Sequence, residues 1–246
     1  MATEIGTHPD ITVNLQAIGR ERAPLLIIDN FVSQPDWLIS QAMKSQFTRN
    51  SPFYPGVRAV APVSYQRLLL SSLRTTLVNA FTLPGSSLGL SVCHYSIVTT
   101  PPQQLHLLQR IPHFDTPDTH ALAAVHYLFA GDQGGTAFYR HRNTGFEYID
   151  EKRAPTYFQS LENENDGPDM PKPSDGYING DSALFEQISH QPGVFNRLIV
   201  YRRNSLHSGA IPSHAQLSAD PQKGRLTISS FIDCHMAPGA EKNRNI

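Results

Sequence analysis

The residues best suited to chemistry in this sequence are a histidine and an aspartate two positions apart, His113 and Asp115, together with a distant histidine, His207. In an extended segment, side chains two positions apart lie on the same face, so His113 and Asp115 can converge on one ion. Two imidazoles and one carboxylate form the facial triad that holds non-heme Fe(II) and leaves its other coordination positions open. The spacing therefore predicts an iron site on these three residues.

Each predicted ligand has an alternative that the sequence leaves open. His113 and Asp115 could form a surface turn in which the aspartate caps a following helix, and His207 could be a hydrogen-bonded turn residue. His214 is the direct alternative to His207 as the distal ligand. We favour His207 because it closely follows the strand predicted at residues 194–204.

Fe(II) with open positions suits a bidentate 2-oxo acid together with dioxygen. A dicarboxylate such as 2-oxoglutarate also needs a cation for its far carboxylate, and the planar fork of arginine pairs with a carboxylate bidentately. Arg225 opens the last predicted strand, and Thr227 shares its face. Gln109, shortly before the iron motif, is a further candidate for the co-substrate pocket. The alternative for Arg225 is a surface salt bridge at the end of a strand.

Three residues that follow the glycine pair at positions 134–135 are candidates for contact with a substrate. They are Tyr139, Arg140 and Arg142. The glycine pair itself is first of all a turn device.

The elements that must position these residues are helices first and short strands afterwards. Two helices are predicted within residues 32–82, the second with leucines at helical spacing that should cover a sheet. Alternating or β-branched segments predict strands at 24–30, 88–100, 105–112, 121–130, 136–141, 183–190, 194–204 and 225–233. Residues 146–162 are predicted to be helical and residues 163–181 to form a long surface loop. This order predicts an α+β, mainly β fold: a sandwich or jelly roll with helices packed outside.

Composition limits the class of protein. The 246 residues are 39% hydrophobic and 17% charged with a net charge of −1, which is typical of a globular chain and argues against nucleic-acid or anionic membrane partners. No apolar run is long enough to span a bilayer, and the N-terminus lacks the features of a signal peptide. Cys93 and Cys234 alone predict no disulfide framework, so we expect a cytoplasmic protein. Residues 1–22 are expected to form a flexible arm and residues 23–246 a single domain.

Four motifs, in this order, resemble those of the Fe(II)/2-oxoglutarate-dependent dioxygenases, whose relatives include prolyl hydroxylases. They are His113-Phe-Asp115, Gly134-Gly135-Thr136, Leu206-His207-Ser208-Gly209 and Arg225-x-Thr227. The longer stretches IPHFDT, HYLFAGDQGGTAFYRHRNTGFE and NRLIVYRRNSLHSG further resemble an uncharacterised bacterial branch of that superfamily. The resemblance covers roughly residues 25 to 235.

This resemblance implies a double-stranded β-helix (a cupin-like jelly roll) with iron on His113, Asp115 and His207 and 2-oxoglutarate on Arg225. The implied activity is O2-dependent hydroxylation or another oxidation of a small molecule, of amino-acid or secondary-metabolite type, with succinate and CO2 as co-products. Halogenating relatives have a small residue where this chain has Asp115, so oxidation without halogenation is favoured. Two alternatives stay open: a non-catalytic β-helix binding protein, and a cupin-type metal enzyme that does not use 2-oxoglutarate. The oligomeric state is open as well, a homodimer included.

Overall fold

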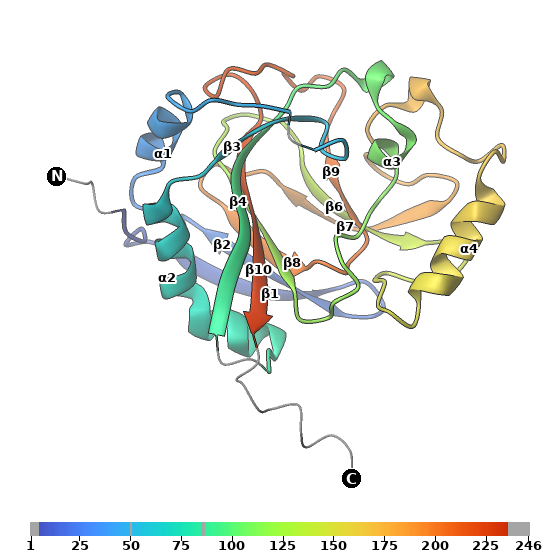
Figure 1. Ribbon diagram of the computed structural model, residues 1–246, viewed down its shortest axis with the longest axis horizontal. Helices are drawn as coiled ribbons and strands as arrows, with labels where there is room; N and C mark the ends of the chain where they lie inside the picture. The colour runs from blue at the N-terminus through green and yellow to red at the C-terminus, as the bar shows by residue number, and fades with distance from the viewer. Residues whose placement is uncertain (1–4, 50, 85–86, 236–246) are drawn as a thin grey trace, which may run out of the picture.

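Two antiparallel sheets form the core of the computed structural model, which describes residues 5–49, 51–84 and 87–235 (Figure 1). The larger sheet has the strand order β1 (Thr12–Ile18), β2 (Ala23–Asp29), β8 (Leu198–Arg202), β5 (Leu122–Tyr127), β10 (Leu226–His235), β4 (Ser87–Val98) and β3 (Gly56–Val60). The smaller sheet has the order β7 (Phe185–Pro192), β6 (Gly135–His141) and β9 (His207–Ala210). The prediction of a mainly β fold is therefore confirmed.

Helices lie outside the sheets. They are α1 (Pro35–Ala42), α2 (Val63–Phe81), α3 (Leu107–Arg110) and α4 (Ala154–Glu164), with short 3-10 helices at Pro102–Gln104 and Pro173–Asp175. Figure 1 shows α1 and α2 on one side of the molecule and α3 and α4 on the other. The predicted apolar stripe of α2 is confirmed, because its buried residues pack against the larger sheet in one continuous core: Tyr65, Leu69, Leu73, Leu77 and Phe81.

Strand β10 has two chemically different faces, as the alternation in its sequence predicts. Leu226, Ile228 and Ile232 are buried in the core beneath the helices. Thr227 and Ser229 point the other way and line a cavity between the sheets. The outer face of the larger sheet is thus sealed by helices, and its inner face is free to build a site.

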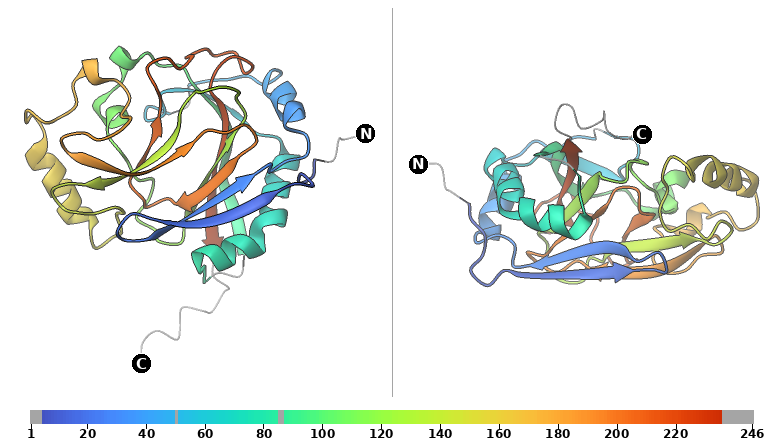
Figure 2. Two further views of the ribbon diagram at one scale, coloured as in Figure 1. Left: turned by 180° about the vertical axis from the view of Figure 1, so that it is seen from behind. Right: turned by 90° about the horizontal axis from the view of Figure 1, so that it is seen from below.

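Several local predictions were wrong. Residues 12–18, expected to belong to a flexible arm, form β1, which pairs with β2 along its whole length at one edge of the molecule (Figure 2). Residues 56–60, where no strand was predicted, form β3. The strand predicted at 105–112 instead contains α3, because Gln109 accepts a hydrogen bond from the backbone N–H of His106 and closes a helical turn. A short apolar run does not by itself distinguish a strand from a helix.

The strands predicted at 183–190 and 194–204 are not partners of each other. Strand β7 pairs with β6, whereas β8 pairs with β2 and β5 in the other sheet. Leu198, Ile199 and Val200 are fully buried, so β8 suits the centre of a covered sheet, whereas β7 is half exposed. The helix predicted from residue 146 begins only at Ala154.

Some expectations concern parts of the chain outside the described residues. These are residues 1–4 of the predicted arm and residues 236–246 of the predicted domain. Among the described residues, no helix combines the length and the apolar character that crossing a bilayer requires.

A buried histidine on β5, His126, lies in the core between α2 and the larger sheet. Its ring stacks on Tyr65 at 5.6 Å between centroids and meets Phe31 edge to face. Its Nε2 lies 3.1 Å from Oδ1 of Asn196, which accepts the hydrogen bond, while Nδ1 is buried without a partner. A second proton would have to bind at Nδ1 and would place an unpaired charge in the core, so burial lowers the pKa of His126 to about 4.

We predict that His126 makes the protein less stable in acid. In the unfolded chain this histidine titrates near 6.5, so between pH 6.5 and about 4 the unfolded state binds more protons than the folded state. The stabilisation is complete above pH 6.5 and is lost as the pH falls towards 4. Between pH 7.5 and 5.0 the free energy of unfolding should fall by roughly 2 kcal/mol because of this residue alone.

Urea denaturation of the parent and of His126→Gln at both pH values, with a chelator present, measures this effect. Glutamine keeps a donor for Asn196 but does not titrate, so the variant should lose that part of the pH dependence. Equal pH dependence in the two proteins would contradict the assignment.

Candidate metal centre and cavity

The two predicted histidine ligands lie side by side because their backbones pair. The N–H of His113 donates to the carbonyl oxygen of His207 at 2.9 Å, and the N–H of His207 donates back to His113 at 2.8 Å. Strand β9, which begins at His207, is held on its other edge by β6, where Phe138 is the partner of His207. The N–H of Asp115 donates to the carbonyl oxygen of Arg203 at 2.8 Å. Backbone hydrogen bonds therefore fix all three positions.

The side chains of the three residues converge. One ligand atom from each of His113, Asp115 and His207 lies within 4.8 Å of the others. Nε2 of His113 is 3.9 Å from Oδ1 of Asp115, and Nε2 of His207 is 3.8 Å from Oδ2, distances too long for hydrogen bonds. Oδ2 of Asp115 is buried and has no hydrogen-bond partner. A buried carboxylate oxygen facing two imidazole nitrogens fits a divalent cation between them.

The proton positions also suit metal binding. Nδ1 of His207 lies 2.9 Å from the carbonyl oxygen of Ser205, which can only accept, so Nδ1 carries the proton and Nε2 presents a lone pair. His113 lies in the cavity wall with about half of its side chain accessible, yet protein surrounds it on most sides. This burial, with His207 and Arg58 nearby, lowers the pKa of His113 to about 4. His113 is therefore in the neutral form that binds a metal.

A cavity of about 630 Å³ opens at this cluster, between the two sheets. The larger sheet contributes residues of its inner face: Arg58, Ala123, Val125, Tyr201, Thr227, Ser229 and Phe231. The smaller sheet contributes Thr136 of β6 and the start of β9. The volume is in the range of pockets that enclose a drug-sized ligand.

Arg225 lies at the inner end of this cavity and is buried. Its Nε donates to the carbonyl oxygen of Gln133 at 3.0 Å and its Nη2 to that of Gly135 at 2.6 Å. No carboxylate pairs with it among the described residues, and its Nη1 has no hydrogen-bond partner there. Burial lowers the pKa of Arg225, although the guanidinium remains charged in a protein. A buried cation without an anionic partner suits an anionic ligand.

The glycine pair that the motif contains brings the backbone to Arg225. Gly134 has φ +80°, and a Cβ atom there would lie 1.9 Å from the carbonyl oxygen of Ala210. A Cβ on Gly135 would lie 1.9 Å from the carbonyl oxygen of Gln191. Only glycine allows β6 to approach both neighbours this closely and to present the carbonyl of Gly135 to the arginine.

Thr227 lies in the cavity wall as predicted, but its hydroxyl donates to the carbonyl oxygen of Ser96 at 3.3 Å. Tyr54, which the sequence analysis missed, is a better-placed hydroxyl. Its Oη is buried and has no hydrogen-bond partner. Burial raises the pKa of Tyr54, while the positive charges of Arg225 and Arg58 oppose that shift. The strand pattern that follows it, at residues 56–60, was the signal that could have drawn attention to this segment.

The predicted substrate residues do not line the cavity. Arg140 forms a buried ion pair with Glu147 and a partly exposed one with Glu186, and Arg142 pairs with Asp181 at the surface. Tyr139 is buried in the core between the smaller sheet and α4. Tyr139 points to the side of β6 that packs against α4, and Arg140 and Arg142 are engaged in ion pairs, so none of the three faces the cavity.

Gln109 lines both the main cavity and a smaller pocket of about 400 Å³. Its amide donates to the carbonyl oxygens of Pro52 and Phe53. Since its carbonyl oxygen already accepts from His106, the side chain holds the loop that carries Tyr54 rather than facing a ligand. The alternative distal ligand, His214, is exposed and lies 3.2 Å from Asp132, apart from the cluster.

The fold and the site define a mainly antiparallel β protein with a candidate His-Asp-His metal centre between its sheets. The model of the family of unknown function DUF6445 matches residues 9–232, and the chain belongs to that family. A comparison with curated proteins gives no significant match.

A solved structure with a similar fold is an enzyme dependent on alpha-ketoglutarate, which is 2-oxoglutarate. The non-heme epimerase SnoN from nogalamycin biosynthesis is 11% identical with a TM-score of 0.50, over 90% of this chain and 83% of its own. HygX from Streptomyces hygroscopicus, solved with nickel, 2-oxoglutarate and hygromycin B, is 13% identical with a TM-score of 0.48, over 87% and 84%. The likeness to SnoN is one of fold.

We predict that the chain binds one divalent ion through His113, Asp115 and His207. Replacing either histidine by alanine should weaken binding by more than the roughly 10–100-fold that loss of an outer hydrogen-bond partner costs. His214→Ala removes an exposed histidine of the same type and should leave affinity unchanged. Metal titration of the four proteins measures this, and unchanged affinity in both ligand variants would overturn the assignment.

Proposed function

We propose that this protein is an Fe(II)- and 2-oxoglutarate-dependent oxygenase built on a double-stranded β-helix, acting on a small molecule. One observation carries the proposal: a 2-His-1-carboxylate cluster and a buried arginine without a carboxylate partner share a single cavity. The cluster suits iron, and the arginine suits the far carboxylate of a dicarboxylate. The sequence motifs and the fold shared with SnoN support the same assignment.

Each residue would have a defined task. His113, Asp115 and His207 would hold Fe(II), which supplies the activation of dioxygen coupled to oxidation of 2-oxoglutarate to succinate and CO2. Arg225 would fix the far carboxylate with the N–H groups of Nη1 and the second N–H of Nη2, because Nε donates to Gln133 and one N–H of Nη2 donates to Gly135. Tyr54 would donate its free hydroxyl to the same carboxylate. The carbonyl of Ser205 would keep His207 in the tautomer that binds the metal.

The reaction is tested by succinate release from 2-oxoglutarate in the presence of Fe(II), ascorbate and dioxygen, with a panel of small molecules. Binding is tested without turnover: under anaerobic conditions, 2-oxoglutarate added to the Fe(II) protein should produce a metal-to-ligand absorption band. Metal binding without that band would favour a cupin-type metal enzyme. Absence of metal binding would favour a non-catalytic binding protein.

We predict that Arg225→Met weakens 2-oxoglutarate binding by about tenfold to more than a hundredfold, because a charge-assisted bidentate pair contributes about 1.5–3 kcal/mol. Iron binding should be unchanged, since Arg225 does not belong to the metal cluster. Arg225→Lys should recover only part of the affinity, because a point charge replaces a fork. The anaerobic absorption titration measures all of these affinities.

The matched control is Lys223→Met, which removes an exposed cation two positions away that pairs with Asp220. Retained iron binding shows that the Arg225 variants are folded. If Arg225→Met binds 2-oxoglutarate as tightly as the parent, the far carboxylate lies elsewhere and the proposed role of Arg225 fails.

A further inference from the structure

A second arginine, Arg58, lines the same cavity from β3 and has no role in the proposed site. Its backbone is fixed on both sides of the strand. Its N–H donates to the carbonyl oxygen of Thr48 and its carbonyl accepts from the N–H of Thr48, both at 2.9 Å, while β4 pairs with it at Ser96. The backbone from which the Arg58 side chain extends is therefore fixed by hydrogen bonds, as the backbone of the predicted metal ligands is.

The guanidinium of Arg58 lies 4.1 Å above the ring of Tyr54, which orients its plane. Its Nε is buried without a hydrogen-bond partner. Within the described parts of the chain it forms no ion pair, and burial lowers its pKa. A guanidinium held over a ring, with a free buried N–H, is arranged to receive an oxyanion.

The other charged groups of the cavity do not balance the positive charge of Arg58. Among the described residues that line the cavity, Asp115 is the single acidic one, and Arg58 and Arg225 are the two arginines. With a divalent metal and a dicarboxylate bound, the positive charges of the metal and Arg225 are balanced by Asp115 and the dicarboxylate. The charge of Arg58 is then left over, and an unpaired charge on a partly buried side chain is unfavourable. A singly charged anionic group on the substrate would balance it.

The mouth of the cavity is apolar. Three of its lining side chains are unusually exposed for their type: Phe53 at 70%, Leu108 at 57% and Phe158 at 54%. Phe158 belongs to an aromatic cluster with Phe114 and Tyr157, with ring centroids 5.7–6.1 Å apart. Exposed apolar side chains around a pocket mark a surface that a ligand covers.

We propose that the substrate is a monocarboxylate with an aromatic or branched aliphatic body, whose carboxylate pairs with Arg58 and whose body covers the apolar mouth. This inference rests on the proposed function, since it assigns the dicarboxylate to Arg225. It makes Arg58 the residue that selects substrates by charge.

The test compares carboxylates with their neutral amides. The probes are 3-phenylpropionate and 4-methylpentanoate, each beside the matching amide, titrated by ligand-observed NMR into the Ni(II)–2-oxoglutarate protein and into the metal-free protein. In the parent, each carboxylate should bind at least about tenfold more tightly than its amide. Arg58→Met keeps an apolar chain over Tyr54 and should abolish the preference, and Arg58→Lys should restore part of it.

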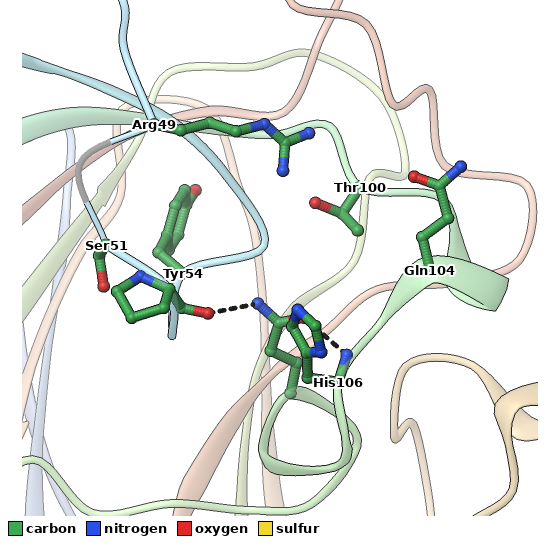
Figure 3. Close-up of a pocket in the computed structure, with 8 residues that line it drawn as sticks. Arg49, Ser51, Tyr54, Thr100, Gln104 and His106 are labelled. Carbon is green, nitrogen blue, oxygen red and sulfur yellow. Dashed lines mark hydrogen bonds between the residues drawn. The ribbon is translucent and has the colours of Figure 1, made fainter.

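Arg49→Met is the matched control, because Arg49 lines the smaller neighbouring pocket with Thr100 and His106 (Figure 3). It should keep the full preference. The inference is overturned if the parent shows no preference, if Arg58→Met retains it, or if Arg49→Met loses it. It is also overturned if Arg58→Met weakens 2-oxoglutarate binding as strongly as Arg225→Met does, because Arg58 would then serve the co-substrate.

Failure of the proposed function gives a different result. If neither metal nor 2-oxoglutarate binds, but the metal-free protein prefers carboxylates in an Arg58-dependent way, the oxygenase assignment fails and the anion site stands. If metal and 2-oxoglutarate bind normally and the preference is absent, only the inference about Arg58 fails.

Discussion

The pair of backbone hydrogen bonds between His113 and His207 is the constraint on which the site depends. One histidine lies in a loop after α3 and the other starts β9, and only this bridge brings their rings to 4.4 Å between centroids. Because β9 is also paired with β6, the hydrogen bonds to His207 fix the loop that carries His113 to the smaller sheet. Asp115 then faces both imidazoles without any hydrogen bond for its Oδ2. Metal affinity in such a site comes from backbone geometry as much as from the ligands themselves.

A second constraint is electrostatic. The inner face of the larger sheet brings Arg58 and Arg225 into one cavity, where Asp115 is the single acidic residue among the described residues of the lining. Backbone carbonyls of Gln133 and Gly135 support the buried guanidinium of Arg225, and the ring of Tyr54 supports the partly buried guanidinium of Arg58. The remaining positive charge has no anionic partner among these residues, and such a charge favours an anionic ligand.

The sequence predicted the residues that carry chemistry where the signal is local, either in the hydrophobic period of one strand or helix or in the spacing within a short motif. The alternation of β10 placed Arg225, Thr227 and Ser229 on one face, and the leucine stripe of α2 predicted which surface covers the sheet. His113, Asp115 and His207 were predicted as one cluster, and the structure brings them together. Short segments were less informative. The segment of β3 has prolines on both sides and was not predicted to be a strand, and the segment that contains α3 was predicted to be one. The missed residues Tyr54 and Arg58 lie in that first segment.

The sequence by itself determined the ligand types, the order of the motifs and the mainly β architecture, because these depend on side-chain chemistry and on local periodicity. Only the tertiary structure decided which side chains share a space. Tyr139, Arg140 and Arg142 do not line the cavity, and β7 and β8 belong to different sheets. Arg58 lines the same cavity as the exposed apolar side chains of its mouth. The physical reason is that strand pairing between distant segments, and the choice of which face of a strand turns inwards, are settled by burial over the whole domain.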